Sequence, residues 1–275
     1  MADLTEALRY DGQRVVVIGA ATGMGAAAAK ALGGLGASVI ALDRVPIDFE
    51  VAQHVTVDLA DRASIDAALE AIDGEVHSVF AAAGMADGPN VARVNFVGHR
   101  HYLERMVNEG MIGAGATVCV ISSTGGLGWE GNLPLILELL ETPDYEAADA
   151  WIAAHEGTDT YIFSKQAMNA YVARQAYPLL SKGIRINAVC PGPTDTPLAR
   201  AHHWLMAGTQ YREATGTDAL TPEQMGNTMI YLNSKLASGI SGALLTVDNG
   251  QIASHLAGSW TVDAPMFDRL LGPRS

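Results

Sequence analysis

Short runs of apolar and β-branched residues alternate along the chain with longer, alanine-rich stretches whose apolar positions recur at helical spacing. Seven of the short runs are typical of buried strands: Val15–Ile18, Ser38–Leu42, Val55–Val57, Val76–Ala82, Thr117–Ile121, Ile184–Val189 and Leu244–Val247. Helices are expected between them, over Met24–Leu35, Arg62–Ile72, Val91–Met111, Thr160–Leu180 and Pro222–Ser234. Because apolar strands separated by helices form parallel sheets covered on both faces, the pattern predicts an α/β fold with a doubly wound sheet of about seven strands.

One interval, from Ile121 to Thr160, is far longer than a loop needs to be. Within it Leu135, Ile136, Leu139 and Leu140 recur at helical spacing, and Thr142-Pro143-Asp144 is typical of an N-cap, a first-turn proline and an acid that open a second helix ending near His155. We therefore expect a helical hairpin inserted over about residues 129–158. No repeat or Pro/Ser-rich linker divides the rest, which favours a single domain over residues 1–275.

Charge and composition narrow the possible partners. With 17 Lys+Arg against 30 Asp+Glu, the net charge of −13 would repel nucleic acid and an acidic acyl carrier protein alike. No apolar run has the roughly 18–20 residues that cross a bilayer, and no signal segment is evident, so no membrane partner is expected. Cys119 and Cys190 lie in apolar stretches, as expected for buried thiols in a reducing compartment, which favours the cytoplasm.

A glycine-rich turn follows the first predicted strand and opens the first helix. Gly19, Gly23 and Gly25 permit positive φ angles and close approach of the backbone, with Thr22 and Met24 between them. The free N–H groups of the following helix would attract a pyrophosphate, as in dinucleotide-binding proteins. The structural alternative is an ordinary turn between strand and helix.

Acidic residues at the ends of the next two strands fit the adenosine half of such a dinucleotide. Asp43 follows the glycines by about 20 residues, where a carboxylate accepts hydrogen bonds from both ribose hydroxyls and repels a 2′-phosphate. It therefore favours NAD over NADP, although the adjacent Arg44 argues the other way. Asp58, followed by Leu59, could bind the adenine amino group or serve as a helix N-cap.

Tyr161 and Lys165 are candidate catalytic groups, because their i, i+4 spacing places both on one helix face. A phenol is a poor base at neutral pH unless a nearby cation stabilises its phenolate. Upstream, Ser122-Ser123 ends a strand, where a hydroxyl can share the negative charge that develops on a substrate oxygen. The alternatives are an exposed helix pair and a strand cap.

Together these motifs resemble the short-chain dehydrogenase/reductase family over nearly the whole chain. The resemblance implies a Rossmann-type fold, NAD(H) as cofactor, and a catalytic tetrad of Asn95, Ser123, Tyr161 and Lys165. In that tetrad Tyr161 exchanges the hydroxyl proton, Ser123 positions the substrate oxygen, Lys165 acidifies the tyrosine and holds the nicotinamide ribose, and Asn95 supports a water. Further cofactor contacts are implied at Ala83, Gly84, Pro191, Gly192, Thr194 and Thr196. The chain departs from the family at Ala82, where an asparagine that braces the sheet is usual.

The long interval between Ser123 and Tyr161 resembles the bacterial 3α-hydroxysteroid dehydrogenase/carbonyl reductase subgroup. The expected substrate is a hydrophobic secondary alcohol or ketone, steroid-like or otherwise cyclic or aromatic, with the pocket walled by Trp129, Leu133 and Trp204. The alternatives are an aryl-propanoid or terpenoid alcohol, or a non-catalytic NAD-sensing regulator.

His202-His203 lacks a carboxylate to complete a metal site, so no metal is expected. A homodimer or homotetramer is expected, with the insert favouring the dimer.

Overall fold

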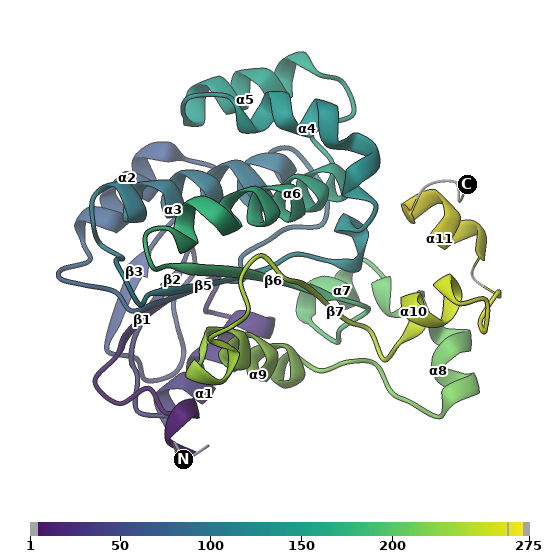
Figure 1. The fold of residues 1–275 in the computed structure, drawn as a ribbon, viewed down its shortest axis with the longest axis horizontal. Coiled ribbons are helices and arrows are strands. Elements are labelled where there is room, and N and C mark those ends of the chain that lie inside the picture. Colours follow the sequence, from purple (N-terminus) through teal and green to yellow (C-terminus); the bar gives the residue numbers. More distant parts are fainter. Residues whose placement is uncertain (1–4, 263, 272–275) are drawn as a thin grey trace.

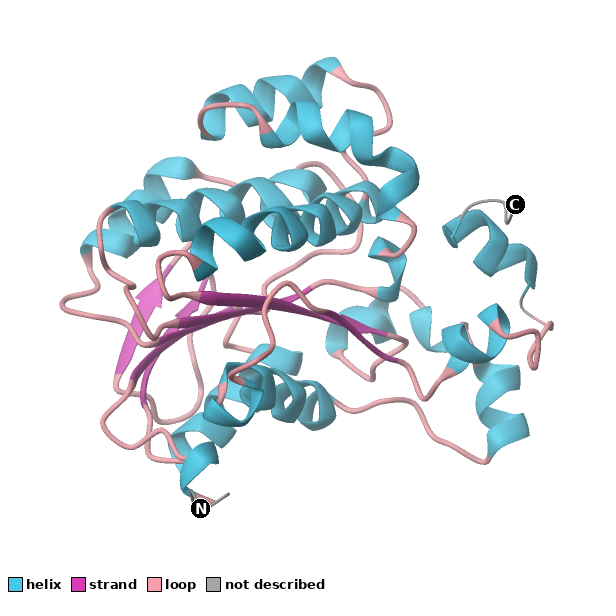
Figure 2. Cartoon of the chain, in the orientation of Figure 1, coloured by secondary structure: helices cyan, strands magenta, loops and turns pink. Residues whose placement is uncertain are grey.

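A parallel sheet of seven strands runs through the centre of the protein, in the order β3-β2-β1-β4-β5-β6-β7 (Figure 2). The computed structural model describes residues 5–262 and 264–271. All seven predicted strands are present: β1 Arg14–Ile18, β2 Ser38–Asp43, β3 Gln53–Thr56, β4 Ser78–Ala81, β5 Thr117–Ile121, β6 Arg185–Pro191 and β7 Leu244–Val247. The chain reverses its direction across the sheet between β1 and β4, and clefts in such sheets form at that switch point, beyond the carboxyl ends of the strands.

Helices cover both faces of the sheet, as the pattern of the sequence predicts (Figure 1). On one face α1 (Gly23–Gly34) packs against α9 (Pro222–Asn233). The other face carries α2 (Arg62–Glu70), α3 (Gly98–Asn108) and α6 (Tyr161–Leu180). A separate apolar core lies on each face, so the strands are buried from both sides. The Rossmann-like, doubly wound architecture is confirmed.

The inserted hairpin forms an additional layer outside α6 (Figure 1). It consists of the short helix η4 (Trp129–Asn132), α4 (Leu133–Leu140) and α5 (Tyr145–Ala154). The apolar face of α4 is buried within the chain's own core, where Ile136 and Leu139 are fully inaccessible. The predicted apolar face of the hairpin is therefore covered by the same chain.

One detail of the predicted hairpin is wrong. The N-cap of α5 is Asp144, whose carboxylate accepts from Ala147 N at 2.8 Å. Thr142 lies two residues beyond the end of α4, where its hydroxyl donates to Leu139 O at 2.6 Å and accepts from Arg100 Nη1 at 2.8 Å. The Thr142 hydroxyl is thus bonded to Leu139 and Arg100, while α5 begins at Tyr145 and is capped by the residue directly before it.

The helix expected over Val91–Met111 is interrupted. Arg93–Val97, labelled η2, forms a π-helical turn immediately before α3. Such turns insert a residue into a helix and re-aim the side chains around them, and they are frequent at functional sites. Asn95 lies at the centre of this turn.

Short helices without predicted counterparts lie beyond the ends of β6 and β7, to the right in Figure 1. These are α7 Pro197–Ala201, η5 Trp204–Met206, α8 Thr209–Thr215, α10 Gln251–Leu256 and α11 Ala264–Leu271. The remaining short helices are η1 Glu6–Leu8, η3 Thr124–Gly126 and η6 Lys235–Ala237. No helix in the described part of the chain is long and apolar enough to span a membrane.

Candidate active site

Two adjoining cavities open at the carboxyl ends of the strands. The larger, of about 810 Å³, is lined by residues that follow β4, β5 and β6. The smaller, of about 300 Å³, lies over the turn between β1 and α1 and the end of β2. Both are walled by the segment Ala82–Met85 and by Met24, Thr196 and Leu198, so the two cavities share one side.

The glycine-rich turn forms the floor of the smaller cavity. Gly19 has φ +81°, and a Cβ there would overlap the backbone of Ala83. A Cβ at Gly25 would overlap the carbonyl oxygen of Gly19, so only glycine fits at either position. Thr22, the N-cap of α1, makes no side-chain hydrogen bond to the first turn, which leaves those N–H groups available to an anion.

Asp43 ends β2 at the wall of this cavity. Its carboxylate accepts from Ala21 N at 2.9 Å and from Val45 N at 3.2 Å, which fixes its position beside the glycine-rich turn. Two bonds leave further lone pairs free, because a carboxylate can accept about four. Arg44 also lines the cavity but is exposed to solvent.

Asp58 and Leu59 line the same cavity. The Asp58 carboxylate accepts from Ala60 N at 2.9 Å. The N-cap of α2 is Asp61, which accepts from Ala63 N at 3.0 Å, so the N-cap alternative for Asp58 is wrong. Asp58 is thus held by a turn of its own, with its side chain at the cavity wall.

The other residues expected at the cofactor also border the cavities, apart from Gly25, which lies beneath the turn. The smaller cavity is bordered by Thr22, Gly23 and Met24, and the larger by Ala83, Gly84, Pro191, Gly192, Thr194 and Thr196. The Thr196 hydroxyl is occupied as the N-cap of α7, accepting from Ala199 N at 3.1 Å. A glycine cradle, an uncapped helix N-terminus and a carboxylate at the strand end together fit a dinucleotide.

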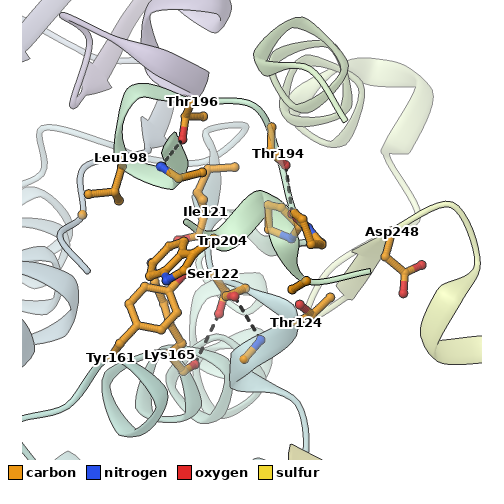
Figure 3. A pocket seen from close by; sticks show the side chains of 18 of the residues that line it. Ile121, Ser122, Thr124, Tyr161, Lys165, Thr194, Thr196, Leu198, Trp204 and Asp248 are labelled. Carbon is orange, nitrogen blue, oxygen red and sulfur yellow. Dashed lines mark hydrogen bonds between the residues drawn. The ribbon is translucent and has the colours of Figure 1, made fainter. Parts of the chain in front are cut away.

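Tyr161 begins α6 and faces the larger cavity, with Lys165 one turn further along (Figure 3). The Lys165 Nζ atom lies 5.7 Å from the centre of the Tyr161 ring and donates to Ile121 O at 3.0 Å. Thr160 caps the helix by accepting from Phe163 N, which fixes where the helix begins. Tyr161 is therefore held at the start of α6, facing the cavity, with the buried Lys165 side chain behind it.

Burial governs the acidity of this pair. It raises the pKa of Tyr161 to about 12, and hydrogen bonding with Ser123 opposes part of that rise. It lowers the pKa of Lys165 to about 8, because the ammonium is cut off from water. Each group is thus shifted toward its neutral form.

Ser123 is brought to Tyr161 by close packing of η3 against α6. A Cβ at Gly126 would overlap the carbonyl oxygen of Lys165, so the two backbones touch. The Ser123 hydroxyl accepts from Gly125 N at 2.9 Å, and the neighbouring Ser122 hydroxyl donates to Lys165 O at 3.3 Å. Ser123 lines the cavity beside Tyr161, together with Ser122, Thr124 and Ile162.

Asn95 lies behind the cavity rather than in its wall. Its amide accepts from Met85 N at 2.8 Å, donates to Met85 O at 2.9 Å, and reaches Ser164 Oγ at 3.2 Å. One turn later His99, which is buried, bonds through Nε2 to Ala83 O at 3.0 Å. These two side chains hold the segment that follows β4.

The outer wall of the larger cavity differs from the prediction. Trp204 lines it as expected, with its ring centre 4.7 Å from that of Tyr161 (Figure 3). Trp129 and Leu133 do not: both pack against the apolar core beneath the insert, because α4 lies on the far side of α6. The wall is completed instead by residues that the sequence analysis did not single out, namely Leu198, Ile252, Phe267 and Leu270.

The spacing of Phe267, Leu270 and Leu271 is helical and could have indicated α11, but not where that helix docks.

Within the described residues no group of three or more His, Cys, Asp or Glu side chains could hold a metal ion. His202 pairs with Asp87 at 3.4 Å instead.

Comparison with known proteins identifies this architecture. The chain is 30% identical over 268 residues to cis-4-hydroxycyclohexanecarboxylate dehydrogenase of Sinomonas cyclohexanicum, covering 86% of this chain and 96% of that protein. It is 25% identical over 259 residues to coniferyl-alcohol dehydrogenase of Pseudomonas sp. (strain HR199), covering 90% of this chain and all of that protein. The family model described as enoyl-(acyl carrier protein) reductase matches residues 147–251.

The chain belongs to the short-chain dehydrogenase/reductase family. Among solved structures, it shares the fold of the 3-alpha-hydroxysteroid dehydrogenase from Pseudomonas sp. B-0831 in complex with NADH, with a TM-score of 0.71 and 24% identity, covering 90% of this chain and all of that one. Membership of the family makes the protein an oxidoreductase, with dehydrogenase or reductase activity.

Proposed function

We propose that the protein is an NAD-dependent dehydrogenase that interconverts a hydrophobic, ring-bearing alcohol and its carbonyl compound. One observation carries the proposal. Tyr161 lines a cavity of about 810 Å³ whose outer wall is apolar, and the Nζ atom of Lys165 lies 5.7 Å from the centre of its ring. The cavity is large enough for the nicotinamide end of a cofactor and a bulky substrate together. A regulator that only sensed NAD would need no such acid–base pair.

The chain's own residues would manage the proton and the substrate oxygen. In oxidation the Tyr161 phenolate takes the hydroxyl proton, and in reduction the Tyr161 phenol returns it to the carbonyl oxygen. The Ser123 hydroxyl donates a hydrogen bond to the same oxygen and fixes its position. The Lys165 ammonium stabilises the phenolate. Asn95 holds the segment around Met85, which lines the cavity, by two hydrogen bonds to the Met85 backbone. When bound, the nicotinamide accepts or supplies the hydride.

The smaller cavity supports NAD rather than NADP as the proposed cofactor. Asp43 is anchored there by two backbone N–H groups and keeps lone pairs for the ribose hydroxyls. A 2′-phosphate would meet this carboxylate at close range, whereas Arg44 is exposed and has freedom to turn into solvent. Gly19, Gly23 and the first turn of α1 would hold the pyrophosphate.

The substrate is expected to be uncharged. Among the described residues that line the larger cavity, Lys165 is the only Lys or Arg and Asp248 the only acid. Lys165 is directed to Tyr161 and Ile121, so no cation is left to bind a substrate carboxylate. Coniferyl alcohol, for which one of the relatives is named, is an uncharged alcohol built on a carbon ring and suits these walls. The hydroxycyclohexanecarboxylate for which another relative is named carries a carboxylate, and this cavity offers that group no free cation. Free, buried Cys119 and Cys190 fit action in a reducing compartment such as the cytoplasm.

A substrate panel tests the proposal. Purified protein is mixed with NAD⁺ or NADP⁺ and with cyclohexanol, a 3α-hydroxysteroid, coniferyl alcohol or an aldohexose, and nicotinamide reduction is followed by absorbance. We expect turnover with at least one of the ring-bearing hydrophobic alcohols and none with the sugar. Binding of NAD without turnover of any alcohol, or a preference for the sugar, contradicts the proposal.

A further inference from the structure

The C-terminal helix α11 meets the catalytic region from the far end of the sequence. A Cβ at Gly128, which follows η3, would overlap the carbonyl oxygen of Leu270 and come within 3.0 Å of Leu271 Cα. Gly128 also has φ +73°, a conformation that favours glycine. The backbones of α11 and of the loop leaving the Ser123 strand are therefore in direct contact.

A second set of contacts fixes α11 to α10. The Phe267 ring lies 4.7 Å from that of His255, centre to centre, and the Asp268 carboxylate is 3.6 Å from His255 Nε2. His255 is 5% exposed and Phe267 is 3% exposed, so this junction is a packed one. Two separate attachments on different elements define where the helix lies.

From this position α11 presents Phe267 and Leu270 to the larger cavity. Three other walls carry the proposed catalytic or cofactor residues, namely the turn after β5, the segment after β6 and the start of α6, while η5 and α10 contribute Trp204 and Ile252. The wall made by α11 carries none of them. Its side chains therefore shape the cavity without belonging to the groups proposed to exchange the proton or to hold the cofactor.

We propose that Phe267 and Leu270 determine which substrates the protein accepts, by packing on the distal ring of an uncharged, apolar alcohol of more than one ring. The inference rests on the proposed function for the identity of the site. A one-ring alcohol that reaches only Tyr161 and Trp204 gains nothing from α11, whereas a steroid-sized alcohol buries its far end against it.

Binding and turnover are measured separately, with androsterone as the steroid probe and cyclohexanol as the small alcohol. Affinity for androsterone is followed by quenching of tryptophan fluorescence, and turnover of both alcohols by nicotinamide absorbance. Phe267→Ala removes the contact, Leu270→Phe fills the space, and Gly128→Ala displaces α11 without touching its side chains. Leu180→Ala is the matched control, because Leu180 is an exposed leucine at the far end of α6.

We expect Phe267→Ala and Gly128→Ala each to weaken androsterone binding about tenfold, the loss expected for one buried apolar side chain. Leu270→Phe should lower kcat/KM for androsterone at least tenfold more than kcat/KM for cyclohexanol, and Leu180→Ala should leave both values within about twofold of wild type. Equal androsterone affinity in the wild type, Phe267→Ala and Leu180→Ala, or no binding to any of them, overturns the inference. Androsterone binding that depends on Phe267 without turnover of either alcohol upholds it and refutes the proposed function instead.

Discussion

Lys165 places its ammonium 5.7 Å from the centre of the Tyr161 ring, where the two residues share one face of α6. Burial raises the pKa of Tyr161 to about 12, so the phenolate needs this positive charge to form at working pH. The charge is maintained below a pH of about 8, the value to which burial lowers the pKa of Lys165.

The first prediction concerns pH. The kcat/KM for oxidation should rise with pH as Tyr161 loses its proton and level off above a pH of about 8, where Lys165 loses its charge. Lys165→Met should move the rise to higher pH because the phenolate loses its cation. At neutral pH the variant should be at least about a hundredfold slower. Lys182→Met, at an exposed lysine beyond the end of α6, is the control. A rising limb at the same pH in Lys165→Met would show that the lysine does not act on the tyrosine.

Cofactor preference is the second prediction. The wild type should favour NAD over NADP by about a hundredfold in kcat/KM, from lost ribose hydrogen bonds and phosphate–carboxylate repulsion. Asp43→Asn should reduce that preference at least tenfold, whereas Asp48→Asn, at an exposed position outside both cavities, should leave it unchanged. Steady-state kinetics with both cofactors measure the ratio. Equal efficiency of the wild type with NAD and NADP would mean that Arg44 outweighs Asp43.

The third prediction links His99 to acid stability. Burial lowers the pKa of His99 to about 4, opposed by the Ala83 carbonyl and reinforced by the nearby charge of Lys165. In the unfolded chain this histidine binds a proton near pH 6.5, whereas in the folded protein it does so only near pH 4. The free energy of unfolding is therefore unaffected above pH 6.5 and falls by about 3 kcal/mol as the pH drops toward 4. Urea unfolding of wild type and His99→Gln at several pH values measures the difference.

His99→Gln should remove most of that acid-dependent loss, since glutamine does not titrate. His54→Gln, at an exposed histidine on β3, should retain it in full. Parallel stability curves for wild type and His99→Gln between pH 6.5 and 4 would show that His99 is protonated in the folded protein too.

The fourth prediction is a dimer in solution. The resemblance to the family implies that the helix corresponding to α6 pairs subunits into tetramers in many relatives. Here α4 packs on α6 within the same chain, and Arg100 fixes its end by donating to Leu139 O at 3.0 Å. With that face covered, light scattering should give twice the mass of one chain. Four times that mass would contradict the prediction.

The sequence was informative wherever function depends on local geometry. The glycine-rich turn, Asp43 at a strand end and the Tyr161–Lys165 spacing are each fixed within one strand, turn or helix, and the structure brings all of them to the two cavities. Their side-chain directions follow from the periods of helix and strand alone.

Features that depend on distant packing were missed or mistaken. Trp129 and Leu133 are expected in the substrate pocket because they follow Ser123, but η4 and α4 turn away over α6, and both side chains pack there, partly buried, against the core. Phe267 and Leu270 reach the pocket through a contact with Gly128 that no local pattern encodes. The π-helical turn contains Asn95, whose side chain bonds to Met85 ten residues earlier, and no local pattern in the sequence indicates either feature.

The most direct test of the proposed function is to remove one oxygen atom from Tyr161. In Tyr161→Phe the ring and its contact with Trp204 remain, but the group that exchanges the proton is gone. Tyr177→Phe, at an 82% exposed position on the same helix, is the matched control and should behave as wild type. We predict that Tyr161→Phe lowers kcat at least about a hundredfold while NADH affinity, titrated by fluorescence, stays within about twofold. Retention of more than about a tenth of wild-type kcat would show that Tyr161 is not the acid–base group.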